Sequence, residues 1–111
     1  MSDGYYHAHD LPRFGDVGRD AGPLFEKFMG WYAAAMGPGA LTEREKALIA
    51  LGVAHAVQCP YCIDAYTQDC QQKGADFEQM TEALHVAVAI RGGASLVHGM
   101  QMREHAKQSG M

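Results

Sequence analysis

Apolar side chains recur at intervals of three and four residues along most of the chain, which is the repeat of an amphipathic α-helix. No stretch alternates between apolar and polar residues for long enough to form a strand. The pattern therefore predicts an all-α fold, a single-domain helical bundle of about five helices. The expected helices cover residues 24–36, about 43–57, 60–73, 77–91 and 95–107.

Capping and helix-breaking residues mark the ends of these segments. Thr42 followed three residues later by Glu45 is a capping box, which satisfies two otherwise unpaired backbone donors. Pro60 lacks an amide donor and disfavours helical geometry at the preceding residue, so one helix should end or kink there and another should begin. Gly74 supplies a left-handed stop, and the glycines at 92–93 are expected to break the fourth helix before a last one starts.

The first 23 residues differ from the rest because glycine and proline interrupt them and little periodicity remains. We predict an irregular N-terminal arm over residues 1–23 and one helical domain over residues 24–111. The aromatic side chains Tyr5, Tyr6 and Phe14 give the arm a means of anchoring on another element. A length of 111 residues fits a single domain.

Charge and composition exclude several classes of function. The formal charge of −4 and the pI near 5.8 leave no basic surface, so no nucleic-acid partner is expected. No run reaches the roughly 18 apolar residues of a membrane span, so no membrane partner is expected either. The N-terminus lacks the cationic and apolar regions of a signal peptide, which predicts a cytoplasmic protein. An odd count of three cysteines argues against a structural disulfide framework.

The strongest chemical signal is the sequence Cys59-Pro60-Tyr61-Cys62. A proline just after the first cysteine places the sulfurs near a helix N-terminus, where unpaired amides and the helix dipole favour a thiolate. A thiolate attacks disulfides and peroxides, and a second cysteine one turn away can resolve the resulting sulfenic acid. The pair therefore predicts thiol redox chemistry that needs no cofactor.

Two other interpretations of the cysteines stay open at this stage. They could be inert helical residues that pack as small hydrophobic side chains. A structural zinc site would need two further ligands, and the sequence has neither a second C-x-x-C nor a suitably spaced histidine pair. Cys70, eight residues beyond Cys62, is too far along the same helix to bond with it and is interpreted as a third thiol.

Two further side chains join the pair if the backbone stays helical or nearly so across the motif. His55, Cys59, Cys62 and Tyr66 then follow one another at offsets of four, three and four and share one face. His55 could take or return a proton, and Tyr66 could donate a hydrogen bond to a sulfur or to a bound oxygen. These four residues are the predicted catalytic site.

Residues 41–51, the motif at 59–62 and the glycines at 92–93 resemble the alkyl hydroperoxidase D and carboxymuconolactone decarboxylase superfamily, over about residues 24–107. Residues 58–70 and 90–98 look most like its arsenosugar biosynthesis-associated peroxidase-like subgroup. The resemblance implies an all-α protein that forms homotrimers or homohexamers. It also implies a C-x-x-C pair that cycles between dithiol and disulfide during hydroperoxide reduction.

The resemblance carries a proton relay only in part. Peroxidases of the superfamily have a histidine four residues after the second cysteine and a glutamate twelve residues before the first, where this chain has Tyr66 and Ala47. The sequence thus predicts an atypical peroxidase in which His55 replaces the histidine. By analogy with the family, Cys62 attacks and Cys59 resolves, although a thioredoxin-like motif would use the first cysteine as the nucleophile.

The sequence therefore predicts a peroxiredoxin-type oxidoreductase that acts on a hydroperoxide or disulfide substrate and is recycled by a thiol reductant. An alternative is a vicinal-thiol protein that binds or exchanges with a thiophilic species such as trivalent arsenic. A third possibility is an oligomeric helical scaffold with inert cysteines. Decarboxylase chemistry fits less well, because that branch does not use a C-x-x-C pair.

Overall fold

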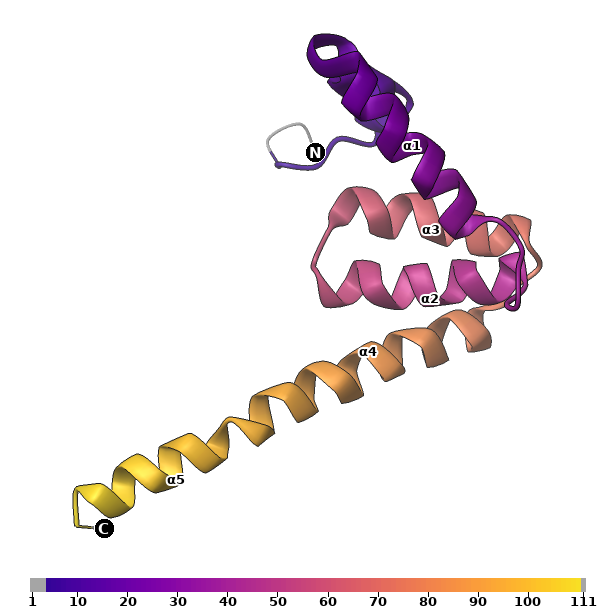
Figure 1. Cartoon of the computed structure of the whole chain (residues 1–111). Helices are drawn as coiled ribbons and strands as arrows, with labels where there is room; N and C mark the ends of the chain where they lie inside the picture. Colours follow the sequence, from indigo (N-terminus) through magenta and orange to yellow (C-terminus); the bar gives the residue numbers. More distant parts are fainter. Residues whose placement is uncertain (1–3, 111) are drawn as a thin grey trace.

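The computed structural model describes residues 4–110 and confirms an all-α chain, with no strand in that range. A 3₁₀-helix, η1, covers Ala8–Ala21. The α-helices are α1 (Gly22–Met36), α2 (Glu43–Ala56), α3 (Pro60–Gln72), α4 (Phe77–Val97) and α5 (Gly99–Gln108). α2 and α3 form an antiparallel pair, α1 rises from one side of it, and α4 leaves from the other (Figure 1).

The predicted capping box forms at the start of α2. The Thr42 Oγ1 atom accepts a hydrogen bond from the Glu45 amide at 3.1 Å, and the Glu45 carboxylate accepts one from the Thr42 amide at 2.7 Å. Hydrogen bonding from Thr42 to the carboxylate, chiefly from the Thr42 amide, lowers the pKa of Glu45. Two of the amides that lack a partner within the helix are thereby satisfied, which explains why α2 begins where it does.

A Thr42→Ala substitution is expected to lower the free energy of unfolding by about 1 kcal/mol, because the N-cap acceptor is lost. Urea denaturation followed by circular dichroism would measure the change. Thr81→Ala, in the exposed interior of α4, is the control and should be neutral or slightly stabilising, because alanine favours helix. Equal effects of the two substitutions would contradict a capping role for Thr42.

The buried core is small and lies where α2 meets α3 and the start of α4. Its buried members are Ala47, Leu51, Cys70, Ala75 and Met80, with Leu48 and Tyr66 packed against them. α4 approaches α2 closely at Gly52, where a Cβ atom would lie 3.2 Å from the carbonyl oxygen of Ala83. α2 is therefore the central helix, and a small side chain on it allows the close contact with α4.

The break predicted at residues 92–93 is wrong. α4 continues through both glycines to Val97, and α5 begins at Gly99 rather than at Ser95. His98, the residue between the two helices, is itself in helical conformation, so α4 and α5 form one nearly continuous rod (Figure 1). Glycine weakens a helix by about 1 kcal/mol but still supplies both backbone hydrogen-bonding groups, so it does not end one by itself.

The arm predicted to be irregular contains the 3₁₀-helix η1, which packs on α1 and α3. Pro12 lies inside it, and Gly18 is buried against Phe25 of α1. A Cβ atom at position 18 would lie 2.4 Å from the Phe25 ring, so glycine is needed for this contact. The arm thus packs on the helical domain of its own chain.

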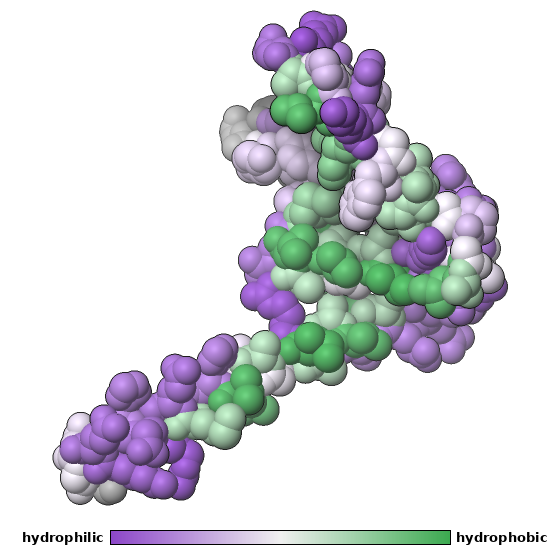
Figure 2. All heavy atoms as spheres, in the orientation of Figure 1, coloured by the Kyte–Doolittle hydropathy of each residue, from purple (hydrophilic) through white to green (hydrophobic). Residues whose placement is uncertain are grey.

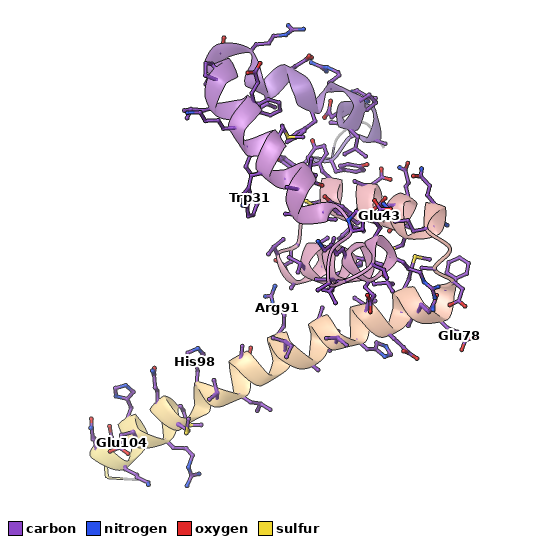
Figure 3. The ribbon with its side chains drawn as sticks, turned by 45° about the vertical axis from the view of Figure 1, so that its right-hand side comes forward. Trp31, Glu43, Glu78, Arg91, His98 and Glu104 are labelled. Carbon is purple, nitrogen blue, oxygen red and sulfur yellow. The ribbon has the colours of Figure 1, made fainter. Side chains whose placement is uncertain are left out.

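The chain is far more extended than a compact domain of its size. Its radius of gyration is 18.7 Å, against about 13 Å expected for a compact chain of this length. Apolar side chains gather over α2 and along α4 (Figure 2), and Trp31 extends from α1 into open space (Figure 3). Large exposed apolar side chains include Trp31, Ile49, Val53, Val86, Ile90, Leu96 and Val97. Within residues 4–110, no helix has the length and apolar character needed to cross a bilayer.

Candidate functional site

The turn between α2 and α3 positions the two cysteines. α2 ends in a Schellman motif: the Gln58 amide donates to the His55 carbonyl and the Cys59 amide to the Ala54 carbonyl, both at 3.1 Å. Gln58 has a φ of +58°, a left-handed conformation that a side chain disfavours. The predicted end of the helix near Pro60 is confirmed, and the turn places Cys59 directly at the start of α3.

Replacing Gln58 with glycine is expected to stabilise the protein by about 1 kcal/mol, because glycine adopts a positive φ without steric cost. Gln71→Gly, the same substitution inside α3, should instead destabilise by about 1 kcal/mol. Thermal unfolding of both variants measures the difference in sign. A loss of stability in both would show that the strain at position 58 is absent.

Cys59 is the N-cap residue of α3. Its backbone is extended, with φ −104° and ψ 103°, and its Sγ atom accepts a hydrogen bond from the Cys62 amide at 3.2 Å. Pro60 takes the first helical position, where a missing amide costs nothing. Both cysteines are free thiols and half-buried. The sulfur of Cys59 thus takes up one backbone amide of the helix start, that of Cys62.

Cys62 faces an apolar groove of about 500 Å³ between α1, α2 and α3. Burial raises the pKa of its thiol to about 11, and the hydrogen bond and charge of Cys59 act in the same direction. Tyr66, one turn further along α3, lines the same groove. Other residues that line this groove are Tyr32 and Met36 of α1 and Lys46, Val53 and Val57 of the α2 segment.

Two polar residues of this groove were missed from the sequence. In the sequence, Tyr32 is only one of the periodically spaced residues of the first helix. In the structure it lines the groove, where burial and the charge of Asp69 raise its pKa. Lys46 Nζ donates to the carbonyl oxygens of Ala35 at 2.8 Å and Gly37 at 2.6 Å, which ties the end of α1 to α2. The only sequence feature that could have predicted this contact is the position of Lys46 next to the apolar run of α2.

The predicted alignment of four site residues on one helical face does not form, because the left-handed turn at Gln58 separates α2 from α3. His55 lies in the last turn of α2 with Nδ1 2.9 Å from the Leu51 carbonyl oxygen. It lines one recess with Tyr6 and Asp64 and another with Arg91, but it is not among the residues that line the Cys62 groove. Arg91 points from α4 toward the end of α2, where it donates to the Ala56 carbonyl (Figure 3).

The relay positions of the superfamily take structural roles here. Ala47 is fully buried in the core beside Leu51 and Cys70. Its methyl side chain cannot accept or donate a proton. Tyr66 packs against the same core and presents its other side to the groove. Among the groove-lining residues there is therefore no carboxylate or imidazole to remove a proton from Cys62.

The N-terminal arm is fastened to the start of α3 through Tyr61, which stands between the cysteines. The Tyr61 hydroxyl donates to the Asp10 carboxylate at 3.1 Å, and its ring packs edge-on against Tyr6 with centroids 4.7 Å apart. The Tyr6 hydroxyl donates to Asp64, and burial with this contact raises the pKa of Tyr6 to about 12. The predicted anchoring by aromatic side chains is thus made within the chain, by Tyr5 and Tyr6 on Tyr61 and by Phe14 on Phe25 of α1.

Comparison with known proteins agrees with this fold. The chain matches the carboxymuconolactone decarboxylase family over residues 22–104. It belongs to the carboxymuconolactone decarboxylase family.

Within residues 4–110, no group of three or more histidine, cysteine, aspartate or glutamate side chains is placed to hold a metal ion.

Two relatives show how far the family likeness extends. A Paracoccus denitrificans protein described as uncharacterized protein 4 in the cox locus is 37% identical over 84 residues, which is 76% of each chain. The crystal structure of an apo carboxymuconolactone decarboxylase family protein from Legionella pneumophila is 30% identical, with a TM-score of 0.69 over 91% of each chain. These matches are to the family as a whole and do not place the chain in the arsenosugar-associated subgroup.

Proposed function

We propose that this chain is a thiol-dependent oxidoreductase that reduces hydroperoxides through a dithiol and disulfide cycle of Cys59 and Cys62. The observation that carries the proposal is the 3.2 Å contact between the Cys59 sulfur and the Cys62 amide at the start of α3. This contact holds the Cys59 sulfur against the backbone of Cys62 itself, so a local rearrangement of the first turn of α3 can bring the two sulfurs into bonding distance.

The groove supports an organic rather than a purely polar substrate. Apolar side chains such as Met36, Val53 and Val57 dominate its lining, while Tyr32 and Tyr66 supply hydroxyl donors near Cys62. An alkyl or aryl hydroperoxide can place its apolar body in this groove and present its peroxide group to the cysteine pair at the start of α3. Reduction yields the alcohol and water and leaves a Cys59–Cys62 disulfide, which an external thiol reductant returns to the dithiol.

The functional unit in this proposal is a homo-oligomer, a trimer or hexamer as the family resemblance implies. Support comes from the extended α4–α5 rod, whose exposed apolar residues Ile90, Leu96 and Val97 would otherwise face water. The proposal also keeps the predicted cytoplasmic location, since cellular thiol reductants there hold a dithiol in its reduced form.

Reaction of the reduced protein with one equivalent of cumene hydroperoxide tests the redox activity. We expect the rapid loss of two thiols and of two mass units, with peptide mapping placing the disulfide between Cys59 and Cys62. The control is the double variant Cys59→Ser and Cys62→Ser, which retains Cys70 and should lose no thiol. Thiols that persist in the wild type would overturn the proposal, and stoichiometric arsenite binding by that unreactive protein would favour the alternative of a thiol-binding protein.

A further inference from the structure

We infer that Cys59 is the attacking sulfur and Cys62 the resolving one, the reverse of the order that the family resemblance implies. The inference rests on the proposed function, because it assigns the two roles within that same dithiol cycle. It is carried by the different placement of the two sulfurs, one at the open N-terminus of α3 and one facing an apolar groove.

Cys59 has the surroundings that a thiolate needs. Its sulfur accepts the Cys62 amide hydrogen at 3.2 Å, and the residue holds the N-cap position, at the positive end of the α3 helix dipole. A negative charge at this end of a helix is stabilised by the helix dipole, and an N–H donor to the sulfur adds to the effect. No proton relay from another side chain is required to form a thiolate at such a position.

Cys62 has the opposite surroundings. The groove that it faces is apolar, and burial raises the pKa of its thiol to about 11. The polar side chains that line the groove come one from each packing helix: Tyr32 of α1, Lys46 of α2 and Tyr66 of α3. The hydroxyl groups of both tyrosines are hydrogen-bond donors, and Lys46 donates to the carbonyls of Ala35 and Gly37. Cys62 therefore keeps its proton at neutral pH.

The family order depends on a relay that this structure does not contain. Ala47 fills a fully buried core position, and His55 lies beyond the turn at Gln58, outside the groove of Cys62. Without an acid or imidazole to accept its proton, a buried thiol is a poor nucleophile. Both observations therefore favour the same assignment: Cys62 has no group to accept its proton, and Cys59 lies at the N-cap, where a thiolate is stabilised.

The chemical steps balance with these roles. The Cys59 thiolate attacks the outer oxygen of the hydroperoxide, the O–O bond breaks, and the alkoxide leaves as the alcohol after taking up a proton; Cys59 becomes a sulfenic acid. The Cys62 sulfur then attacks the Cys59 sulfur, the S–O bond breaks, and the thiol proton of Cys62 leaves with the hydroxide as water. A dithiol reductant restores both thiols by exchange and takes the disulfide.

Single serine variants, each leaving one cysteine of the pair, separate the two sulfurs. Serine is a good N-cap residue, so Cys59→Ser should preserve α3 and its fold, as far-UV circular dichroism will check. At pH 7 with cumene hydroperoxide and a dimedone-type trap, Cys62→Ser should give a trapped sulfenic acid at Cys59. Cys59→Ser should react at least about tenfold more slowly, because the remaining sulfur faces an apolar groove that disfavours its thiolate. Its rate should keep rising as the pH is raised above neutrality, because burial raises the pKa of the Cys62 thiol.

Alkylation of the reduced wild type tests the assignment independently of peroxide activity. With limiting iodoacetamide at pH 7, peptide mapping should find Cys59 modified first. Faster modification of Cys62, or a faster-reacting Cys59→Ser than Cys62→Ser variant, would overturn the assignment even if the disulfide cycle is real. Absence of any reaction with peroxide, together with preferential alkylation of Cys59, would remove the proposed function and retain the difference between the sulfurs.

Discussion

Charged residues introduced on the α4–α5 rod are expected to dissociate the homo-oligomer proposed above into single chains. Ile90 and Leu96 are 69% and 81% exposed in one chain, and the chain has a small core from which the rod projects (Figure 1). Burial of such a side chain in a partner contributes about 1.5–3 kcal/mol. Replacing both with glutamate removes this gain and adds charges that would have to be buried, so we expect a weakening of assembly by about a thousandfold or more.

Light scattering after size-exclusion chromatography measures the result. The wild type should have a mass that is a multiple of 12.1 kDa, and the double variant should shift toward the mass of one chain with reduced thermal stability. The double variant Gln101→Glu and Gln108→Glu adds the same two charges at exposed polar positions of the same rod and should leave the mass unchanged. A wild-type protein that elutes as a stable single chain would contradict the assembly.

Restoring the acid that superfamily peroxidases carry at position 47 is expected to destabilise the protein and not to activate it. Ala47 is fully buried among Leu51, Cys70 and Met80, so Ala47→Glu must fit a larger side chain and desolvate a carboxyl group. We expect a loss of about 3 kcal/mol or more at pH 7, from overpacking and from the burial of an unpaired polar group.

Ala47→Gln separates the effect of charge from that of volume, because the amide has the same shape. Burial would raise the pKa of the introduced carboxyl above its unfolded value. The extra penalty of glutamate over glutamine should therefore be absent below about pH 4 and grow as the pH rises. Urea denaturation at pH 4 and at pH 8 measures this difference. A Glu variant as stable as the wild type and faster with hydroperoxide would show that position 47 can still serve a relay.

Local signals in the sequence predicted most of the helices and their ends. The capping box at Thr42 and the left-handed residue at Gly74 both occur as expected, because each depends only on backbone groups a few residues away. The C-x-x-C pair likewise lies at a helix start, as Pro60 predicts. The glycines at 92–93 were misjudged because their effect on a helix is a small energetic cost that the helical neighbours override.

The candidate site could be predicted only in part. One short segment, the start of α3, contains Cys59, Cys62 and Tyr66, and their spacing along it is enough to bring them close. The relation of His55 to that segment depends on the conformation of Gln58, and a left-handed glutamine has no clear sequence signal. Tyr32 reaches the groove from a helix some thirty residues earlier, through a packing arrangement that helical periodicity does not encode.

The sequence alone was sufficient to determine that this chain is helical, where α2, α3 and α4 begin and which two sulfurs lie at the start of one of these helices, because capping, proline geometry and helical spacing act over a few residues. The tertiary structure decided which sulfur accepts a backbone hydrogen bond and which faces an apolar groove. It also placed His55 outside that groove and Ala47 in the core. Desolvation depends on every element packed around a group, so the reactivity of a thiol is a property of the folded chain.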